Sequence, residues 1–246
     1  MDNILIYPTG STAACRYAAQ FLQKQNIPLV DHPTPEVTHL LLDIPSFGSD
    51  GKLRSGGALE PLLEMLPPNI TVIGGHLSHP ALEHHRTVDL LMDAHYLSVN
   101  AAITADCALQ VATPLLTTTL QDSPALVIGW GRIGKCLAQM LKALRCNVTV
   151  AARKEADRAM LRALQYEAVD MEQMVRTLPK YRLIFNTAPE SVLSAGQLRK
   201  CSAVKIDLAS RRGLESGDVV WARGLPGIHA PESSGKLIAE TILSII

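Results

Sequence analysis

Apolar and polar positions follow two alternating periods along nearly the whole chain, one typical of strands and one typical of helices. Short apolar runs rich in β-branched residues predict buried strands, and in the first third of the chain they lie at residues 4–7, 37–43 and 70–74. Helical spacing is found between and after them, at residues 12–25, 59–65 and, more briefly, 81–85. Ser11 or Thr12 could cap the first helix. Strands that alternate with helices predict a parallel sheet.

The second half repeats this alternation. Strands are predicted at residues 125–128, 146–153, 183–186 and 203–208, and helices at residues 154–164, 171–178 and 233–246. Between the halves, residues 100–120 predict a long helix that Pro114 breaks or kinks.

These elements predict an α/β fold with two Rossmann-like, doubly wound parallel-sheet domains joined by a long interdomain helix. We expect a substrate-side domain at residues 1–95 and an NADP-binding Rossmann domain, with the linker helix, at residues 96–246. The helix at residues 233–246 is apolar on one face and could pack back onto the first domain.

A glycine-rich turn joins a predicted strand to a predicted helix. Residues 125–134 read Ala-Leu-Val-Ile-Gly-Trp-Gly-Arg-Ile-Gly, and strand, G-x-G-x-x-G and helix in this order form the dinucleotide-binding fingerprint. The first glycine allows the tight turn, the second lets the backbone approach a pyrophosphate, and the third lets the helix pack on the strand. The positive end of the helix dipole then faces the phosphates. The sequence therefore predicts nucleotide contacts from Gly129, Trp130, Gly131, Arg132, Ile133 and Gly134.

The end of the next strand distinguishes NADP from NAD. An NAD-binding unit usually carries an acidic residue there, which holds the ribose 2′-hydroxyl. This chain has Ala151-Ala152-Arg153-Lys154, and no acid before Glu155. Because a guanidinium can grip a 2′-phosphate that a carboxylate would repel, we favour NADP over NAD. The alternative is that Arg153 and Lys154 only keep the strand end in contact with water.

Small polar residues follow two further predicted strands of the second domain. They are Asn186, Thr187, Ala188 and Pro189 after the first strand, and Asp207 and Ser210 after the second. Open α/β sheets bind ligands at the carboxyl ends of their strands, so we expect these residues to contact the ribose or the nicotinamide. Each segment alone is also typical of an ordinary turn.

Composition excludes several classes of protein. The 246 residues are 47% hydrophobic and 19% charged, which excludes a disordered chain. Basic and acidic residues number 23 each, so no charge excess predicts nucleic-acid binding. No apolar run reaches the roughly 18 residues of a membrane helix, and the N-terminus lacks a secretion signal. The five cysteines are scattered without a C-x-x-C pair, which indicates reduced thiols and a cytoplasmic protein.

Two groups of side chains could carry chemistry but have simpler explanations. His76, His79, His84 and His85 lack a cysteine or an acid at ligand spacing, so we predict no metal site and favour a solvated face. His229 lies in a Pro/Gly-rich loop at residues 224–231, where it could act as a general acid or base or be an ordinary loop histidine.

Three of these segments, at residues 183–189, 206–210 and 224–231, resemble the C-terminal signature of the dipicolinate synthase A family. Asn100-Ala-Ala-Ile-Thr-Ala-Asp106 is similar to the interdomain segment of that family. The resemblance implies two Rossmann-like domains, hydride transfer with a nicotinamide nucleotide on a dihydro- or tetrahydrodipicolinate-type ring, and work with a second, flavoprotein-like protein, dipicolinate synthase B. The chain departs from the family at Pro8–Thr12, at Asp106-Cys107 and at Arg211–Leu214, where a dicarboxylate would be held.

We therefore expect an NAD(P)-dependent oxidoreductase whose small anionic substrate contacts Asn100, Thr104, Arg211 and Arg212 in an interdomain cleft. Both arginines could instead face water. The first alternative is a 2-hydroxyacid-type dehydrogenase, and the second is a non-catalytic protein that binds a nucleotide or a partner. We also expect a homo-oligomer.

Overall fold

The computed structural model describes residues 4–215 and 218–246, which form two compact units. Unit 1 takes the chain up to Asn100 together with Pro226–Ile246, and unit 2 takes Ala101–Leu225. Helix α3 (Ala94–Ala112) gives its first residues to unit 1 and the rest to unit 2. The boundary that we expected after residue 95 lies between Asn100 and Ala101 in the structure, inside this helix.

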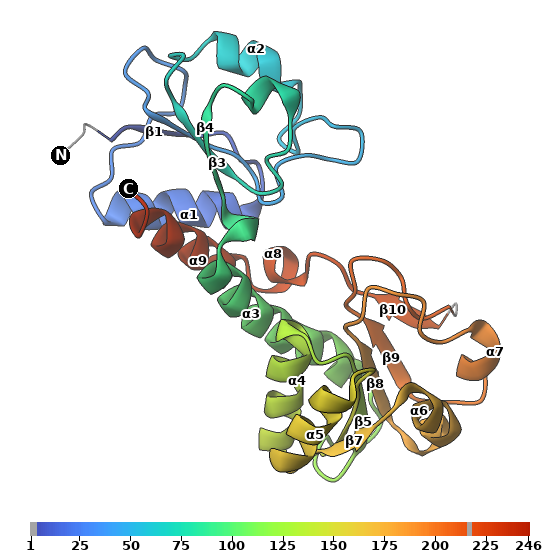
Figure 1. The fold of residues 1–246 in the computed structure, drawn as a ribbon. Coiled ribbons are helices and arrows are strands. Elements are labelled where there is room, and N and C mark those ends of the chain that lie inside the picture. The colour runs from blue at the N-terminus through green and yellow to red at the C-terminus, as the bar shows by residue number, and fades with distance from the viewer. Residues whose placement is uncertain (1–3, 216–217) are drawn as a thin grey trace. The chain divides into compact units, whose positions relative to one another are not determined.

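Unit 1 is built on a four-stranded parallel sheet in the order β1-β2-β3-β4, of which Figure 1 labels β1, β3 and β4. Its strands are β1 (Ile6–Pro8), β2 (His39–Leu41), β3 (Thr71–Gly74) and β4 (Arg86–Asp89). Leu40, Leu42 and Val72 lie in the core cluster that α2 (Leu59–Glu64) helps to cover. The predicted helix at residues 81–85 is a short 3-10 helix at Pro80–Leu82, and a second 3-10 helix follows β4 at Leu90–Met92.

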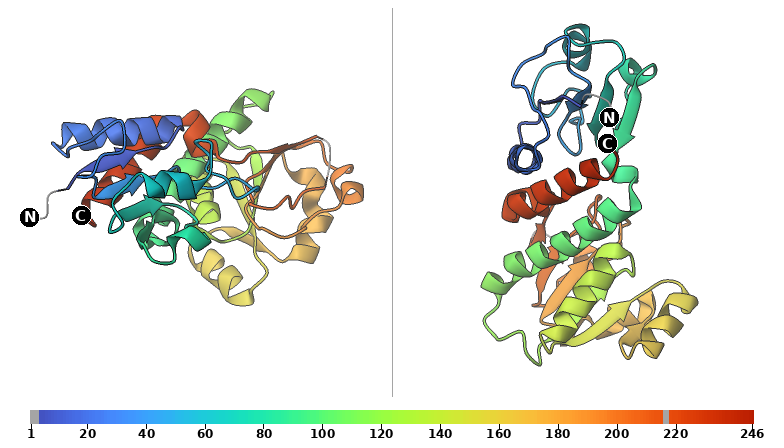
Figure 2. Two further views of the ribbon diagram at one scale, coloured as in Figure 1. Left: turned by 90° about the horizontal axis from the view of Figure 1, so that it is seen from above. Right: turned by 90° about the vertical axis from the view of Figure 1, so that its left-hand side faces the viewer.

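The C-terminal helix packs against the first helix of unit 1. Helix α9 (Pro231–Leu243) runs beside α1 (Ala13–Lys24), as Figures 1 and 2 show from different sides. Gly235 makes the close approach possible, because a Cβ at this position would lie 2.6 Å from the Ala14 carbonyl oxygen and 2.4 Å from the Tyr17 Cβ. The last segment of the chain thereby completes the core of unit 1.

A buried carboxylate lies just before the N-terminus of α1. Asp43 is 2% exposed and accepts hydrogen bonds from the backbone N–H groups of Ser11 and Thr12, both at 3.0 Å, and from both hydroxyl groups. Burial opposes ionisation of Asp43, but the hydrogen bonds from Thr12 and Ser11 outweigh it and lower the pKa of the carboxyl group. Thr12 is the N-cap residue and accepts a hydrogen bond from the Cys15 N–H. The start of α1 is therefore neutralised by a charge of the chain itself.

Unit 2 contains a six-stranded parallel sheet in the order β10-β9-β8-β5-β6-β7. Its strands are β5 (Pro124–Ile128), β6 (Asn147–Ala151), β7 (Glu167–Val169), β8 (Leu183–Asn186), β9 (Val204–Asp207) and β10 (Val219–Trp221). The strand order reverses at β5, which creates the crevice where open α/β sheets bind ligands. The predicted fold class, α/β with two Rossmann-like parallel sheets, is confirmed.

Helices connect the strands of unit 2. They are α4 (Arg132–Ala143), α5 (Glu155–Ala163), α6 (Met171–Thr177) and α7 (Ala195–Leu198), with α8 (Leu225–His229) at the exit to unit 1. The helix predicted at residues 100–120 begins earlier, at Ala94, and ends at Ala112, directly before a 3-10 turn at Thr113–Leu115 that contains Pro114. In the part of the chain that the structure describes, no helix combines the length and apolarity needed to cross a membrane.

Candidate nucleotide-binding site

All six strands of the unit 2 sheet end level with one another at one edge. The register aligns their last residues, which from β7 to β10 across the sheet are Val169, Ala151, Ile128, Asn186, Asp207 and Trp221. The glycine turn and every predicted nucleotide contact lie at or after these strand ends. The sheet therefore gathers the candidate residues of unit 2 along one edge.

The three glycines of the turn lie in different surroundings. Gly129 has a φ of +102°, which favours glycine, and a Cβ there would lie 2.6 Å from the Thr187 Oγ1 atom. At Gly134 a Cβ would lie 2.3 Å from the Gly129 carbonyl oxygen, so this glycine lets α4 approach the turn. At Gly131 a Cβ would meet no protein atom within 4 Å. The middle glycine thus faces open space, as expected where a pyrophosphate must approach the backbone.

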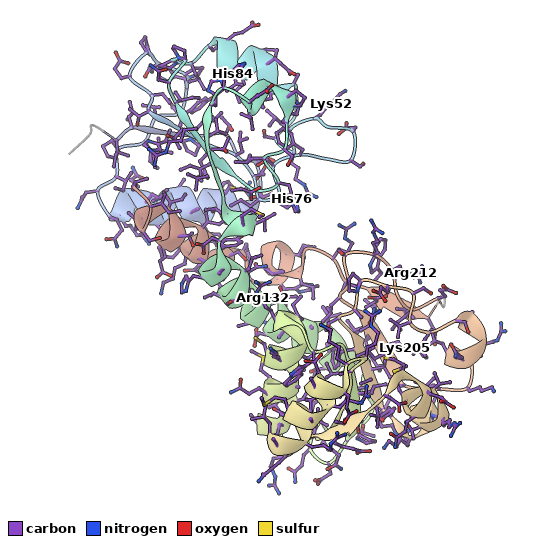
Figure 3. All side chains as sticks on the ribbon, viewed as in Figure 1. Lys52, His76, His84, Arg132, Lys205 and Arg212 are labelled. Carbon is purple, nitrogen blue, oxygen red and sulfur yellow. The ribbon has the colours of Figure 1, made fainter. Side chains whose placement is uncertain are left out.

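Helix α4 begins beside this open space. Gly131 is its N-cap residue, and the first backbone hydrogen bond of the helix runs from the Lys135 N–H to the Gly131 carbonyl at 3.0 Å. The N–H groups of Arg132, Ile133 and Gly134 precede that bond, so they lack an intrahelical acceptor. Three donors and the positive end of the helix dipole therefore suit an anion such as a pyrophosphate. Figure 3 labels Arg132, whose exposed side chain belongs to the first turn.

Trp130 occupies the turn between the first two glycines. Its ring meets the Tyr166 ring edge-on, with centroids 5.9 Å apart, and the Lys135 ammonium lies 5.7 Å from its centroid. Both contacts fix the indole beside the turn. The Trp130 ring is thus held by protein contacts, and its predicted contact with the cofactor stays a prediction.

The loop after β6 carries the predicted phosphate-binding cations. Arg153 is exposed, and its Nη2 atom lies 3.0 Å from the Oε1 atom of Glu190. Lys154 is exposed and is the N-cap residue of α5. The guanidinium of Arg158 donates to the carbonyl groups of Ala152 and Arg153, both at 2.6 Å, and thereby holds this loop in place. No sequence motif points to Glu190 or Arg158 as residues of this site.

Asn186 and Asp207 lie inside the protein and bind each other. Both are 0% exposed, and the Asn186 Nδ2 atom donates to Asp207 Oδ1 at 2.9 Å. The same aspartate oxygen accepts from the Ala209 N–H, and its Oδ2 atom accepts from the N–H groups of Gly213 and Leu214 at 2.7 and 2.9 Å. These side chains therefore fix the loops after β8 and β9. In this arrangement neither side chain exposes a polar atom that could make the predicted direct contact with the cofactor.

The remaining predicted cofactor residues lie at the ends of the same strands. The Thr187 hydroxyl donates to the Ile128 carbonyl at 2.9 Å and lies directly against Gly129 of the glycine turn. Ala188 is half-buried and donates its N–H to Asn186 Oδ1, whereas Pro189 and Ser210 are exposed. Pro189 and Ser210 thus remain accessible to a ligand at this edge.

The predicted substrate and acid–base residues are divided between the two units. Asn100 ends the first segment of unit 1, whereas Thr104, one helical turn further along α3, belongs to unit 2 and is buried. Arg211 and Arg212 are exposed in the loop after β9, where Arg212, labelled in Figure 3, donates from Nε to the Leu214 carbonyl. His229 was expected in an irregular loop, but it is the exposed last residue of α8 and belongs to unit 1.

Among the histidines that the sequence groups together in unit 1, His76 and His84 are exposed, whereas His79 has local structural contacts. His79 stacks on Phe47 with centroids 5.0 Å apart, and its Nδ1 atom accepts a hydrogen bond from the Ala81 N–H. Among the described residues, no three His, Cys, Asp or Glu side chains are grouped so that they could share a metal ion.

Comparison with known proteins agrees with this geometry. Residues 96–191 match the family model "D-isomer specific 2-hydroxyacid dehydrogenase, NAD binding domain". Dipicolinate synthase A of Bacillus subtilis (strain 168) is 24% identical over an alignment of 235 positions, which covers 87% of this chain and 79% of that protein. The chain resembles dipicolinate synthase A. The resemblance inferred from the strand-end motifs is therefore confirmed.

Solved structures show the same fold. Dipicolinate synthase A from Bacillus halodurans superposes with a TM-score of 0.83 at 22% identity and covers 99% of this chain and 97% of that one. A D-isomer specific 2-hydroxyacid dehydrogenase from Lactobacillus delbrueckii ssp. bulgaricus, in its NAD-complexed form, gives 0.55 at 11% identity, with 98% and 95% covered. The matched NAD-binding segment contains the glycine turn, and it supports a nicotinamide cofactor and an oxidoreductase.

Proposed function

We propose that the chain is an oxidoreductase that prefers NADP and transfers hydride on a dihydro- or tetrahydrodipicolinate-type ring. The observation that carries this proposal is the open space at Gly131, with three unbonded helix donors on one side and the Arg153 guanidinium after the neighbouring strand. The resemblance to dipicolinate synthase A supports the substrate class.

The residues of unit 2 fit a nicotinamide dinucleotide in three ways. The N–H groups at the start of α4 would bind the pyrophosphate, because they are donors without an intrahelical acceptor. Arg153 would hold the 2′-phosphate with charge-assisted hydrogen bonds. Ser210, exposed at the end of β9, would hydrogen-bond the nicotinamide half. The bound cofactor would supply or accept the hydride.

The substrate side of the proposal rests on charge. A dicarboxylate needs fixed positive partners once water is removed, and Arg211 is an exposed cation in the loop after β9. We assign Arg211 and Arg212, both in the loop after β9 of unit 2, to the substrate carboxylates. A flavoprotein-like dipicolinate synthase B and a second copy of this chain are the proposed partners.

A titration followed by an assay tests the proposal. The purified protein is titrated with NADPH and with NADH by calorimetry, and it is then assayed for change in nicotinamide absorbance with the ring substrate. Tighter binding of NADPH and turnover of the ring are expected. Equal or tighter binding of NADH would refute the NADP preference. Binding without turnover, with the flavoprotein-like partner present, would indicate a non-catalytic nucleotide-binding protein.

A 2-hydroxyacid substrate is the second candidate, because the matched family model belongs to dehydrogenases of that class. The same assay with a panel of 2-hydroxy and 2-oxo acids distinguishes the two. Turnover of these acids, with none of the ring substrate, would favour the second candidate.

A further inference from the structure

One ion pair joins two loops on opposite sides of the glycine turn. Arg153 follows β6 and Glu190 follows β8, and their side chains meet at 3.0 Å although 37 residues separate them. Strands β6 and β8 are the two neighbours of β5, the strand that ends in the glycine turn. The pair therefore crosses the end of β5, where a dinucleotide bound at the turn would extend toward the end of β6.

The main chain on both sides of this ion pair is held in place. Arg158 fixes the Arg153 carbonyl at 2.6 Å. On the other side, Gly213 packs so closely that a Cβ there would lie 2.5 Å from the Glu190 carbonyl oxygen, and the Val192 N–H donates to the Gly213 carbonyl at 2.8 Å. The two loops thus keep the carboxylate within reach of the guanidinium, and only the side chains can move apart.

This arrangement matters for the choice between NADP and NAD. A 2′-phosphate bound by Arg153 has the same sign of charge as the Glu190 carboxylate and needs the same guanidinium donors. NADH lacks the 2′-phosphate and therefore does not compete with Glu190 for the donors of Arg153.

We propose that Glu190 is a specificity-determining residue that competes with the cofactor 2′-phosphate for Arg153 and so limits the preference for NADPH. The inference rests on the proposed function, because it assumes that Arg153 is the 2′-phosphate site. The Glu190 carboxylate reduces the preference for NADPH over NADH at that site without contacting the reacting atoms.

The expected size of the effect follows from exposure. The Arg153 and Glu190 side chains are 74% and 60% exposed, and exposed ion pairs contribute at most about 1 kcal/mol. Glu190→Gln should therefore tighten NADPH binding about threefold to fivefold. NADH binding should change less than about twofold, since no phosphate competes.

The test is calorimetric titration of wild type, Glu190→Gln and two controls with both nucleotides. Glu240→Gln removes a carboxylate from another exposed ion pair, with Lys236 on α9 in unit 1, and should leave both affinities unchanged. In an Arg153→Ala background, Glu190→Gln should favour NADPH less than it does in the wild type, because the competition for the guanidinium is then absent. Added salt should reduce the gain, because it screens exposed charges.

An unchanged ratio of NADPH to NADH affinity in Glu190→Gln would overturn this inference, and so would equal tightening of both. A wild type that binds NADH more tightly, while Glu190→Gln still selectively strengthens NADPH, would refute the proposed NADP preference and support the inference. A wild type that binds neither nucleotide would overturn both.

Discussion

Replacing Gly131 with valine is the most direct perturbation of the proposed nucleotide site. The backbone of Gly131 has φ −79° and ψ −171°, a conformation that valine adopts readily, and no protein atom lies within 4 Å of the new Cβ. Valine is a poor N-cap residue, which costs up to about 1 kcal/mol. Loss of glycine flexibility in the unfolded chain offsets this by about 0.4–1 kcal/mol. We therefore expect the free energy of unfolding to stay within about 1 kcal/mol of wild type.

Binding should respond much more strongly. The valine side chain would occupy the space in which the pyrophosphate reaches the N–H groups at the start of α4. Losing two charge-assisted hydrogen bonds, each about 1.5–3 kcal/mol, weakens binding by roughly 3–6 kcal/mol. That corresponds to an increase in Kd of roughly 10²- to 10⁴-fold for NADPH and NADH alike.

Calorimetric titration together with urea unfolding measures both quantities. Gly134→Ala is a reference for the urea measurement alone, because an added Cβ would lie 2.3 Å from the Gly129 carbonyl oxygen and should destabilise unit 2 by about 1–3 kcal/mol. A folded Gly131→Val variant with wild-type affinity for both nucleotides would refute the assignment of the glycine turn.

Two further predictions concern single side chains. Arg153→Ala should weaken NADPH binding by about 1.5–3 kcal/mol, roughly 10- to 150-fold, and leave NADH nearly unchanged in the same titration; equal losses for both would refute the 2′-phosphate assignment. Asp43→Asn should lower the free energy of unfolding of the chain at neutral pH, because the asparagine cannot supply the charge that Ser11 and Thr12 bind. Since the folded-state pKa of Asp43 is lowered, its contribution is complete above the ordinary value of about 3.9 and is lost as the pH falls further. Urea unfolding at several pH values should therefore show the difference between wild type and variant shrinking below about pH 4, and a constant difference would contradict the role of the charge.

The elements found by sequence analysis are those with a continuous apolar pattern. The central strands β5 and β8 are buried at nearly every position, so their apolar residues form an unbroken run. Three strands escaped prediction: β4, β7 and β10. All three lie at the edges of their sheets, have only three or four residues and keep exposed or half-exposed positions. Such strands lack the apolar run that reveals a buried one.

The site could be predicted only where its geometry is local. The glycine turn needs a strand, a turn and a helix that follow one another, so the sequence reveals it directly. The pairing of Arg153 with Glu190 depends on two loops 37 residues apart, which only the strand order brings together. The fully buried pair Asn186 and Asp207 illustrates the same limit. Polar residues after strands suggested ligand contacts, whereas their donors and acceptors meet within the protein.

The buried carboxylate of Asp43 determines how many dinucleotides we expect one chain to bind. In each unit a helix follows the strand that comes first in the chain: α1 follows β1, and α4 follows β5. At α1, however, Asp43 is a tethered competitor with a high effective concentration, which a dissolved phosphate would have to displace from four hydrogen bonds. At α4, Gly131 leaves the corresponding position open. We therefore expect a titration to reach saturation at one dinucleotide per chain, although the chain contains two sheets of related design.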